Sequence, residues 1–196
     1  MLQRHDLYFF LYPPAGVAEA AAERWQQMLA DLDPALLSRP MATQRLHLTL
    51  QHLGQFEGSV PRAVLDLALA AGERLVHEPF DVCLHLLQSR GATHAGSNGT
   101  VELAGQGAGV QMLRSFQRSL GGAMRQAGFA EAQIRSRFSP HMTLHYGLGG
   151  VRRQAVAPVV WTVSDFALVD SLYGLSRHEV LSRWPLVARQ QSFTGW

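Results

Sequence analysis

The tetrapeptide His47-Leu48-Thr49-Leu50 recurs in the second half of the chain as His141-Met142-Thr143-Leu144. Both tetrapeptides have the form His-x-Thr-Leu, and chance alone produces such a match far less than once in 196 residues. Each lies in a short, mostly apolar segment that predicts a β-strand, over 46–53 and 138–146. A motif that occurs twice in the same structural setting predicts a chain of two similar halves.

Successive side chains of a strand point to opposite faces, so His47 and Thr49 share one face, and the second motif repeats this pattern. If the halves are related by a pseudo-two-fold axis, the polar faces meet across a cleft that contains two imidazoles and two hydroxyls. The same alternation places His145 on the face of His141. It places His52 on the face opposite to His47.

Two imidazoles and two hydroxyls are suited to phosphodiester chemistry. One imidazole takes a proton from water, and the other protonates the departing sugar oxygen. The hydroxyls of Thr49 and Thr143 bind the phosphate oxygens. Neither motif has a nearby carboxylate cluster or a His-Glu-x-x-His pattern, so the scheme contains no metal. For one motif alone, a purely structural role of the histidine in its strand is the stronger interpretation. Because the motif occurs twice, a catalytic role is favoured instead.

The remaining pattern predicts an α+β protein with a single domain over 1–196. We expect it to be bilobal, with two pseudo-symmetric antiparallel-sheet lobes, each with helices on the outside, and an active-site cleft between them. No Pro/Gly/Ser-rich linker separates the halves. The expected helices cover 15–32, 60–75 and 110–127. The expected strands cover 7–12, 46–53, 80–88, 100–104, 138–146, 156–169 and 180–187, with a turn region at 91–99.

Composition limits the possible classes of protein. Hydrophobic residues make up 47% of the chain and charged residues 16%, which is typical of a soluble globular domain. The lone Cys83 excludes an internal disulfide and a multi-cysteine zinc site. The apolar run 7–12 is too short to span a membrane and lacks the features of a secretory signal, so we expect no membrane association and a cytoplasmic location. Between 110 and 155 the sequence contains seven arginines and one glutamate, which makes this stretch locally basic.

The sequence resembles the 2H phosphoesterases, and within them the RNA 2′,3′-cyclic phosphodiesterases, also called 2′-5′ RNA ligase-like or LigT-like proteins. The resemblance covers nearly the whole chain. It is carried by Tyr8-Phe9-Phe10-Leu11-Tyr12-Pro13-Pro14, by Leu46-His47-Leu48-Thr49-Leu50-Gln51-His52-Leu53-Gly54, by Ser139-Pro140-His141-Met142-Thr143-Leu144, and by Tyr173 with the later Trp184-Pro185-Leu186.

This resemblance implies a bilobal fold, no cofactor, and hydrolysis of RNA 2′,3′-cyclic phosphate ends to 2′-phosphates, with a weak reverse activity that forms 2′-5′ linkages. It implies that His47 is the acid for the 3′ oxygen, that His141 is the base for water, and that Thr49 and Thr143 bind phosphate. The implied partners are RNA with cyclic phosphate ends, tRNA fragments among them, or small cyclic phosphates. We expect a monomer.

Two positions depart from the family pattern. His52 stands where many relatives have Phe, and Tyr146 stands where they have Arg. We expect Arg137, His145 and Tyr146 to contact the substrate, with Arg135 or Arg137 replacing the missing arginine. A solvated loop for the arginines and a structural role for His145 are the alternatives. Aromatic residues beside the motifs are candidates for stacking a base.

Three rival functions remain open at this point. The same catalysis can serve a small cyclic nucleotide or an ADP-ribose cyclic phosphate. A non-catalytic RNA-end-binding module would keep its salt-sensitive RNA affinity after replacement of His47, whereas an enzyme would lose turnover. A metallohydrolase would lose activity with a chelator.

Overall fold

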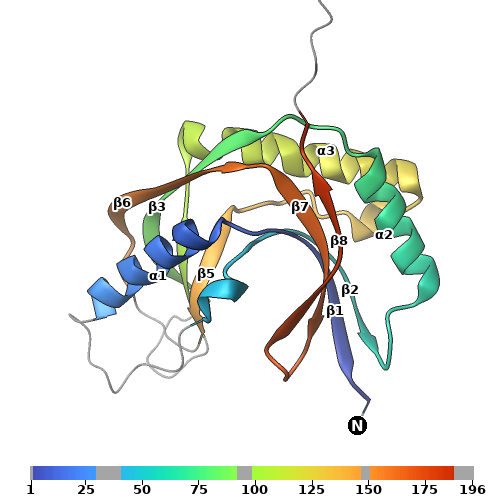
Figure 1. The fold of residues 1–196 in the computed structure, drawn as a ribbon, viewed down its shortest axis with the longest axis horizontal. Helices are drawn as coiled ribbons and strands as arrows, with labels where there is room; N and C mark the ends of the chain where they lie inside the picture. The colour runs from blue at the N-terminus through green and yellow to red at the C-terminus, as the bar shows by residue number, and fades with distance from the viewer. Residues whose placement is uncertain (1, 30–40, 92–98, 147–150, 188–196) are drawn as a thin grey trace, which may run out of the picture.

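The structure is a computed structural model that describes residues 2–29, 41–91, 99–146 and 151–187. Its strands form one antiparallel eight-stranded sheet in the order β6-β3-β4-β5-β2-β1-β7-β8 (Figure 1). The strands are β1 (Arg4–Leu11), β2 (Leu48–Glu57), β3 (Phe80–Arg90), β4 (Thr100–Ala104), β5 (His141–Tyr146), β6 (Gln154–Val163), β7 (Asp165–Leu172) and β8 (Arg177–Pro185). The helices are α1 (Ala15–Leu29), α2 (Arg62–Arg74) and α3 (Gln111–Ala127), with short 3-10 turns at Thr43–Arg45, Gly107–Val110 and Glu131–Gln133.

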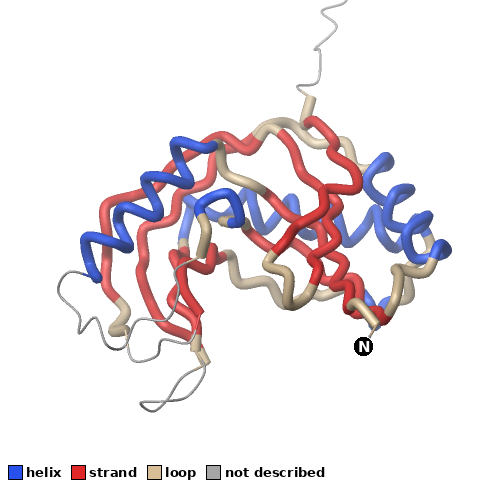
Figure 2. The backbone as a smooth tube through the Cα atoms, turned by 60° about the horizontal axis from the view of Figure 1, so that its bottom comes forward, coloured by secondary structure: helices blue, strands red, loops and turns tan. Residues whose placement is uncertain are grey.

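The sheet is strongly curved, and the helices lie at different places along it (Figures 1 and 2). Helices α2 and α3 pack against each other on the convex side, whereas α1 contacts β5 and β6. Helix α3 forms because apolar residues recur at three- and four-residue spacing, and Leu113, Phe116, Leu120 and Met124 are all fully buried. No helix in the described ranges is long and apolar enough to cross a bilayer.

The two motif strands are neighbours at the centre of the sheet. β2 and β5 meet through the pair Leu48 and Met142, which are the second residues of the two motifs. In an antiparallel pair, this register brings His47 toward Thr143 and Thr49 toward His141. The strands β6-β3-β4-β5 lie on one side of this junction and β2-β1-β7-β8 on the other.

The predicted α+β class is confirmed. The sheet is continuous across the junction of the two halves, so the division into two lobes stays a prediction. One predicted element is wrong: the single strand at 156–169 is two strands, β6 and β7, separated by Ser164. β6 pairs with β3 and β7 with β1, so the chain crosses between distant parts of the sheet at this point. The end of the predicted helix at 30–32 and most of the turn region at 91–99 lie outside the described residues.

Candidate active site

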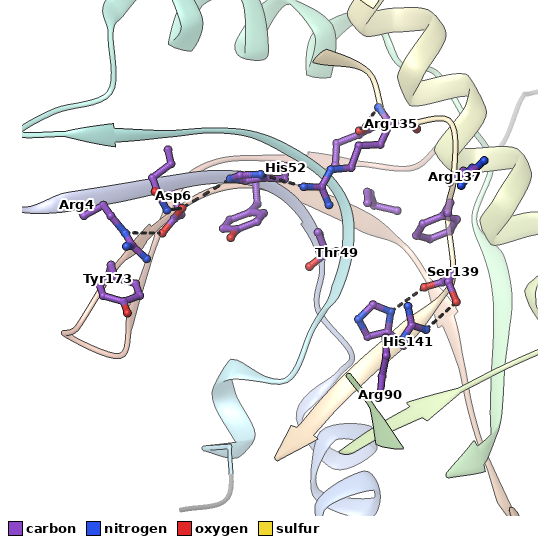
Figure 3. Close-up of a pocket in the computed structure, with 15 residues that line it drawn as sticks. Arg4, Asp6, Thr49, His52, Arg90, Arg135, Arg137, Ser139, His141 and Tyr173 are labelled. Atoms are coloured by element: carbon purple, nitrogen blue, oxygen red, sulfur yellow. Dashed lines mark hydrogen bonds and ion pairs between the residues drawn. The ribbon is translucent and has the colours of Figure 1, made fainter. Parts of the chain in front are cut away.

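A cavity of about 740 Å³ lies beside the junction of the motif strands (Figure 3). It is lined from β1, β2, β3 and β5, from the loop before β5 and from the turn after β7. Its polar walls carry four arginines and two histidines, so an anion that enters meets mainly positive or hydrogen-bond-donating groups. The lining residues are Arg4, Asp6, Tyr8, Thr49, Leu50, Gln51, His52, Gln55, Arg90, Arg135, Arg137, Phe138, Ser139, His141 and Tyr173.

The two motif histidines are held by the same hydrogen bond. His47 Nδ1 lies 2.6 Å from the carbonyl oxygen of Arg45, and His141 Nδ1 lies 2.7 Å from that of Ser139. In each case the carbonyl belongs to the residue two positions earlier. Because a carbonyl oxygen only accepts, each Nδ1 carries the proton and donates it. The Nε2 atom of each ring is therefore the one that exchanges protons with a ligand.

His47 has an apolar environment. Its ring stacks on Phe10 with a centroid distance of 3.8 Å, and the edge of His178 lies 5.1 Å away. Desolvation by burial is the main cause that lowers the pKa of His47 to about 3. The hydrogen bond to the Arg45 carbonyl opposes this shift, and the charges of His178 and Arg45 add to it. His47 is therefore neutral near pH 7 in the free protein. The acid role that the resemblance implies requires a further proton on Nε2, which an adjacent phosphate anion favours.

β-bulges in both motif strands change which residues face the cavity. In β2, Phe10 pairs with Thr49 and Phe9 with Gln51, so Leu50 is the extra residue. In β5, Leu144 is skipped in the same way, between the partners of Thr143 and His145. The fourth motif residue is thus bulged in both halves. A bulge shifts the alternation of side chains by one position, so simple counting fails beyond it.

This shift explains two wrong predictions about histidines. His52 lines the cavity together with Thr49, whereas the sequence predicted that it points away. His145 has no exposed surface, lies 5.7 Å from the ring of Trp25, and does not line the cavity. Its expected contact with substrate is therefore not supported. Tyr146 is 53% exposed and also lies outside the cavity lining.

The structure brings three of the expected residues to the cavity wall. Thr49, His141 and Arg137 line it, while His47 and Thr143 lie beside it without forming part of its lining. Figure 3 shows Thr49 and His141 facing the same space from β2 and β5. The expected arginine replacement has two candidates, because Arg135 lines the cavity as well.

Arg135 is held by buried glutamines. Gln51, with no exposed surface, accepts from the backbone N–H of Arg135 at 3.0 Å and donates to its carbonyl at 3.2 Å. Gln117 of α3 donates to the same carbonyl at 2.8 Å. The guanidinium of Arg135 donates to Nδ1 of His52 at 3.2 Å. The cavity face of Arg135 is therefore fixed by residues of β2 and α3.

Several cavity residues were missed by sequence reasoning, among them Arg4, Asp6 and Arg90. Arg4 stacks over the ring of Tyr173 at 3.2 Å, and Gln55 donates to the buried Asp6 at 2.7 Å. Arg90 lies two residues beyond the predicted strand 80–88, in the part of β3 that only the structure shows, so the sequence offered no signal for it. Within the described ranges, no group of three or more His, Cys, Asp or Glu residues is arranged to hold a metal ion.

A known superfamily matches most of this chain. The model of the 2′-5′ RNA ligase superfamily matches residues 13–174, which include both motifs. The chain belongs to this superfamily. No curated protein matches the sequence. β8, which carries His178, lies beyond the match to the superfamily model.

Solved structures with the fold of this superfamily cover nearly the whole chain. A structure described as a phosphoesterase is 25% identical, with a TM-score of 0.66 over 96% of this chain and 100% of its own. The protein TT0787 of Thermus thermophilus is 25% identical, with a TM-score of 0.67 over 92% of this chain and 97% of its own. E. coli LigT in its apo form is 23% identical, with a TM-score of 0.63 over 95% and 99%, and shares the fold.

Proposed function

We propose that this protein hydrolyses the 2′,3′-cyclic phosphate ends of RNA to 2′-phosphates by acid–base catalysis with His47 and His141, with a weak reverse reaction that forms 2′-5′ linkages. The observation that carries the proposal is the matched pair of histidines at the starts of two adjacent central strands, with His47 immediately before β2 and His141 the first residue of β5. Each has Nδ1 fixed by a backbone carbonyl and Nε2 left for proton exchange. Membership of the 2′-5′ RNA ligase superfamily supports it.

The reaction balances with these two groups alone. A water molecule attacks phosphorus and gives a proton to one Nε2, the bond from phosphorus to the 3′ oxygen breaks, and the other Nε2 protonates that oxygen. The product is a 2′-phosphate with a free 3′-hydroxyl. Each proton transfer contributes about 10²–10⁴ to the rate.

Anion binding follows from the cavity wall. The Thr49 hydroxyl and, from the other motif, Thr143 are proposed to hydrogen-bond the non-bridging oxygens as charge develops on them. Arg135 and Arg137 supply positive charge at the cavity wall. A guanidinium binds phosphate through two parallel hydrogen bonds. Arg135, whose backbone is held in place, is therefore suited to take the role of the arginine that many relatives have at the position of Tyr146.

The site also has the dimensions for more than a phosphate. At about 740 Å³ the cavity accommodates a terminal nucleotide, and Phe138 and Tyr173 in its wall present rings to a base. E. coli LigT, which is similar in fold, forms crystals with 3′-AMP and with phosphate. RNA ends are therefore the proposed substrate.

The test is turnover of a short RNA ending in a 2′,3′-cyclic phosphate, with chelator present, by the wild-type protein and by His47→Ala and His141→Ala. We expect a 2′-phosphate product and rates at least about 10²-fold lower in both variants. His85→Ala, on β3 but outside the cavity lining, is the matched control and keeps the wild-type rate.

Other outcomes contradict the proposal in distinct ways. No turnover of RNA but turnover of a small cyclic nucleotide moves the substrate to that class. RNA binding without turnover, unchanged in His47→Ala, indicates a binding module. Loss of wild-type turnover with the chelator overturns the two-histidine mechanism.

A further inference from the structure

The two motifs have unlike neighbours at one equivalent position. Thr49 pairs across the sheet with Phe10 of β1, and Thr143 pairs with Glu102 of β4. Phe10 stacks on the first motif histidine. Glu102 takes the corresponding place in the second half, so a carboxylate stands where its counterpart has a phenyl ring. This difference arises at a single register position of an otherwise repeated arrangement.

Glu102 is buried without any exposed surface, and its two oxygens have different surroundings. Oε1 accepts from Gln88 at 2.7 Å and from two nitrogens of Arg90 at 2.8 and 3.0 Å. Oε2 is buried and has no hydrogen-bond partner, and it lies 3.6 Å from Nε2 of His141. A buried oxygen without a hydrogen-bond partner destabilises the fold, so its presence beside His141 calls for a functional explanation.

Arg90 connects both sides of the same imidazole. It pairs with Glu102 through one set of contacts, and its guanidinium also donates to the Ser139 hydroxyl at 2.9 Å. The Ser139 carbonyl in turn accepts the Nδ1 proton of His141. Arg90 therefore contacts both residues that flank the imidazole. It bonds to Ser139, whose carbonyl accepts the Nδ1 proton, and to Glu102, whose carboxylate lies beside Nε2.

We propose that Glu102 is a positioning residue for His141, which orients its imidazole and stabilises the imidazolium form through the otherwise unpartnered Oε2. The proposal rests on the proposed function, since it concerns the proton exchanged at Nε2 during catalysis. A carboxylate favours a nearby imidazolium by charge attraction, and burial strengthens the interaction. The separation of 3.6 Å leaves Nε2 without a full hydrogen bond and thus available to substrate.

Other charged and titratable groups also lie near His141. Arg90 approaches from β3, Arg137 shares the cavity wall, and His47 lies across the junction, immediately before β2. All three carry, or acquire on protonation, a positive charge that opposes the imidazolium. Glu102 is the acidic group that the described residues place against the ring.

The test is Glu102→Gln, followed by histidine NMR titration of the free protein. The glutamine keeps an oxygen for Arg90 and Gln88, and it puts an N–H donor where Oε2 faced Nε2, which favours neutral imidazole. We expect the titration midpoint of His141 to fall by about one pH unit. The signal is assigned by its absence in His141→Gln. Glu131→Gln, which removes the charge of another arginine-paired glutamate on the surface, leaves the midpoint unchanged.

Glu102→Asp is the second variant, and it carries the test if the first does not fold. The aspartate keeps the negative charge, but its side chain is one methylene shorter and places that charge farther from His141. The titration midpoint of His141 is therefore expected to lie between those of wild type and Glu102→Gln. A midpoint that equals the wild-type value in the folded variants overturns the proposal. On the RNA substrate, Glu102→Gln is expected to lower kcat about tenfold, with KM within about twofold, and to displace one limb of the pH–rate profile.

The NMR readout does not depend on turnover, so the two proposals fail separately. A shifted midpoint in a protein that does not hydrolyse RNA supports the coupling of Glu102 to His141 and overturns the proposed function. Turnover by wild type with an unshifted midpoint in Glu102→Gln keeps the proposed function and overturns the role of Glu102. A change confined to KM also contradicts it, because the pairing would then act on substrate binding alone.

Discussion

Replacement of Gln51 by methionine tests whether the rigidity of Arg135 matters to the site. The change keeps side-chain length but removes the acceptor for the Arg135 N–H, bonded at 3.0 Å, and one of two donors to its carbonyl. An unsatisfied N–H costs about 1–3 kcal/mol. For a chain of this size, each kcal/mol lowers Tm by about 2–4 °C. We therefore expect Tm to fall by several degrees and KM for the cyclic-phosphate RNA to rise about three- to tenfold, with kcat little changed.

Gln117→Met is the matched control. It removes the 2.8 Å donor to the same carbonyl, but the carbonyl keeps its bond from Gln51 and the N–H keeps its acceptor. We expect a smaller loss, of about 0.5–1.5 kcal/mol, and a KM near the wild-type value. The measurements are thermal denaturation and initial rates over a range of RNA concentrations. A Gln51→Met protein with wild-type Tm and KM would refute the reasoning, as would an Arg135→Ala protein with unchanged KM.

Two further predictions concern the surroundings of His47 and the packing of the helices. Since the pKa of His47 is lowered to about 3, its neutral form stabilises the fold above about pH 6.5, and this contribution is lost as pH falls toward 3. Phe10→Leu admits water to the stacked face and raises that pKa, as histidine NMR will show; an unchanged titration contradicts the burial argument. Gly72→Ala places a Cβ against the ring of Trp184 and costs about 1–3 kcal/mol of stability. Gly122→Ala, with nothing within 4 Å of its Cβ, stabilises the fold by about 0.5–1 kcal/mol, and thermal denaturation measures both changes. Equal stability of the Gly72→Ala and Gly122→Ala proteins would contradict the packing argument.

Much of the local structure was predictable because it depends on short-range patterns. The strand Thr100–Ala104 has the predicted bounds, and α3 begins within one residue of its predicted start. The apolar spacing of α3 and the repeated His-x-Thr-Leu motif are properties of neighbouring residues. The motif also indicated two polar faces, and the structure places Thr49 and His141 on the wall of one cavity.

The bulges were not predictable from the same patterns. Leu50 and Leu144 are ordinary strand residues in the sequence, and only pairing with β1 and β4 makes each of them the extra residue. Each bulge reverses the facing of the residues that follow it. His52 therefore reaches the cavity and His145 becomes buried, the opposite of what alternation predicted.

Local sequence patterns were enough to indicate an α+β chain and a candidate set of two histidines and two threonines in repeated strand motifs. Tertiary structure decided which partners surround each histidine, because strands distant in sequence supply them. Phe10 and His178 give His47 an aromatic environment, while Glu102 and Arg90 give His141 a charged one. These contacts depend on the order and register of the strands, which arise from packing across the whole sheet rather than from any local segment.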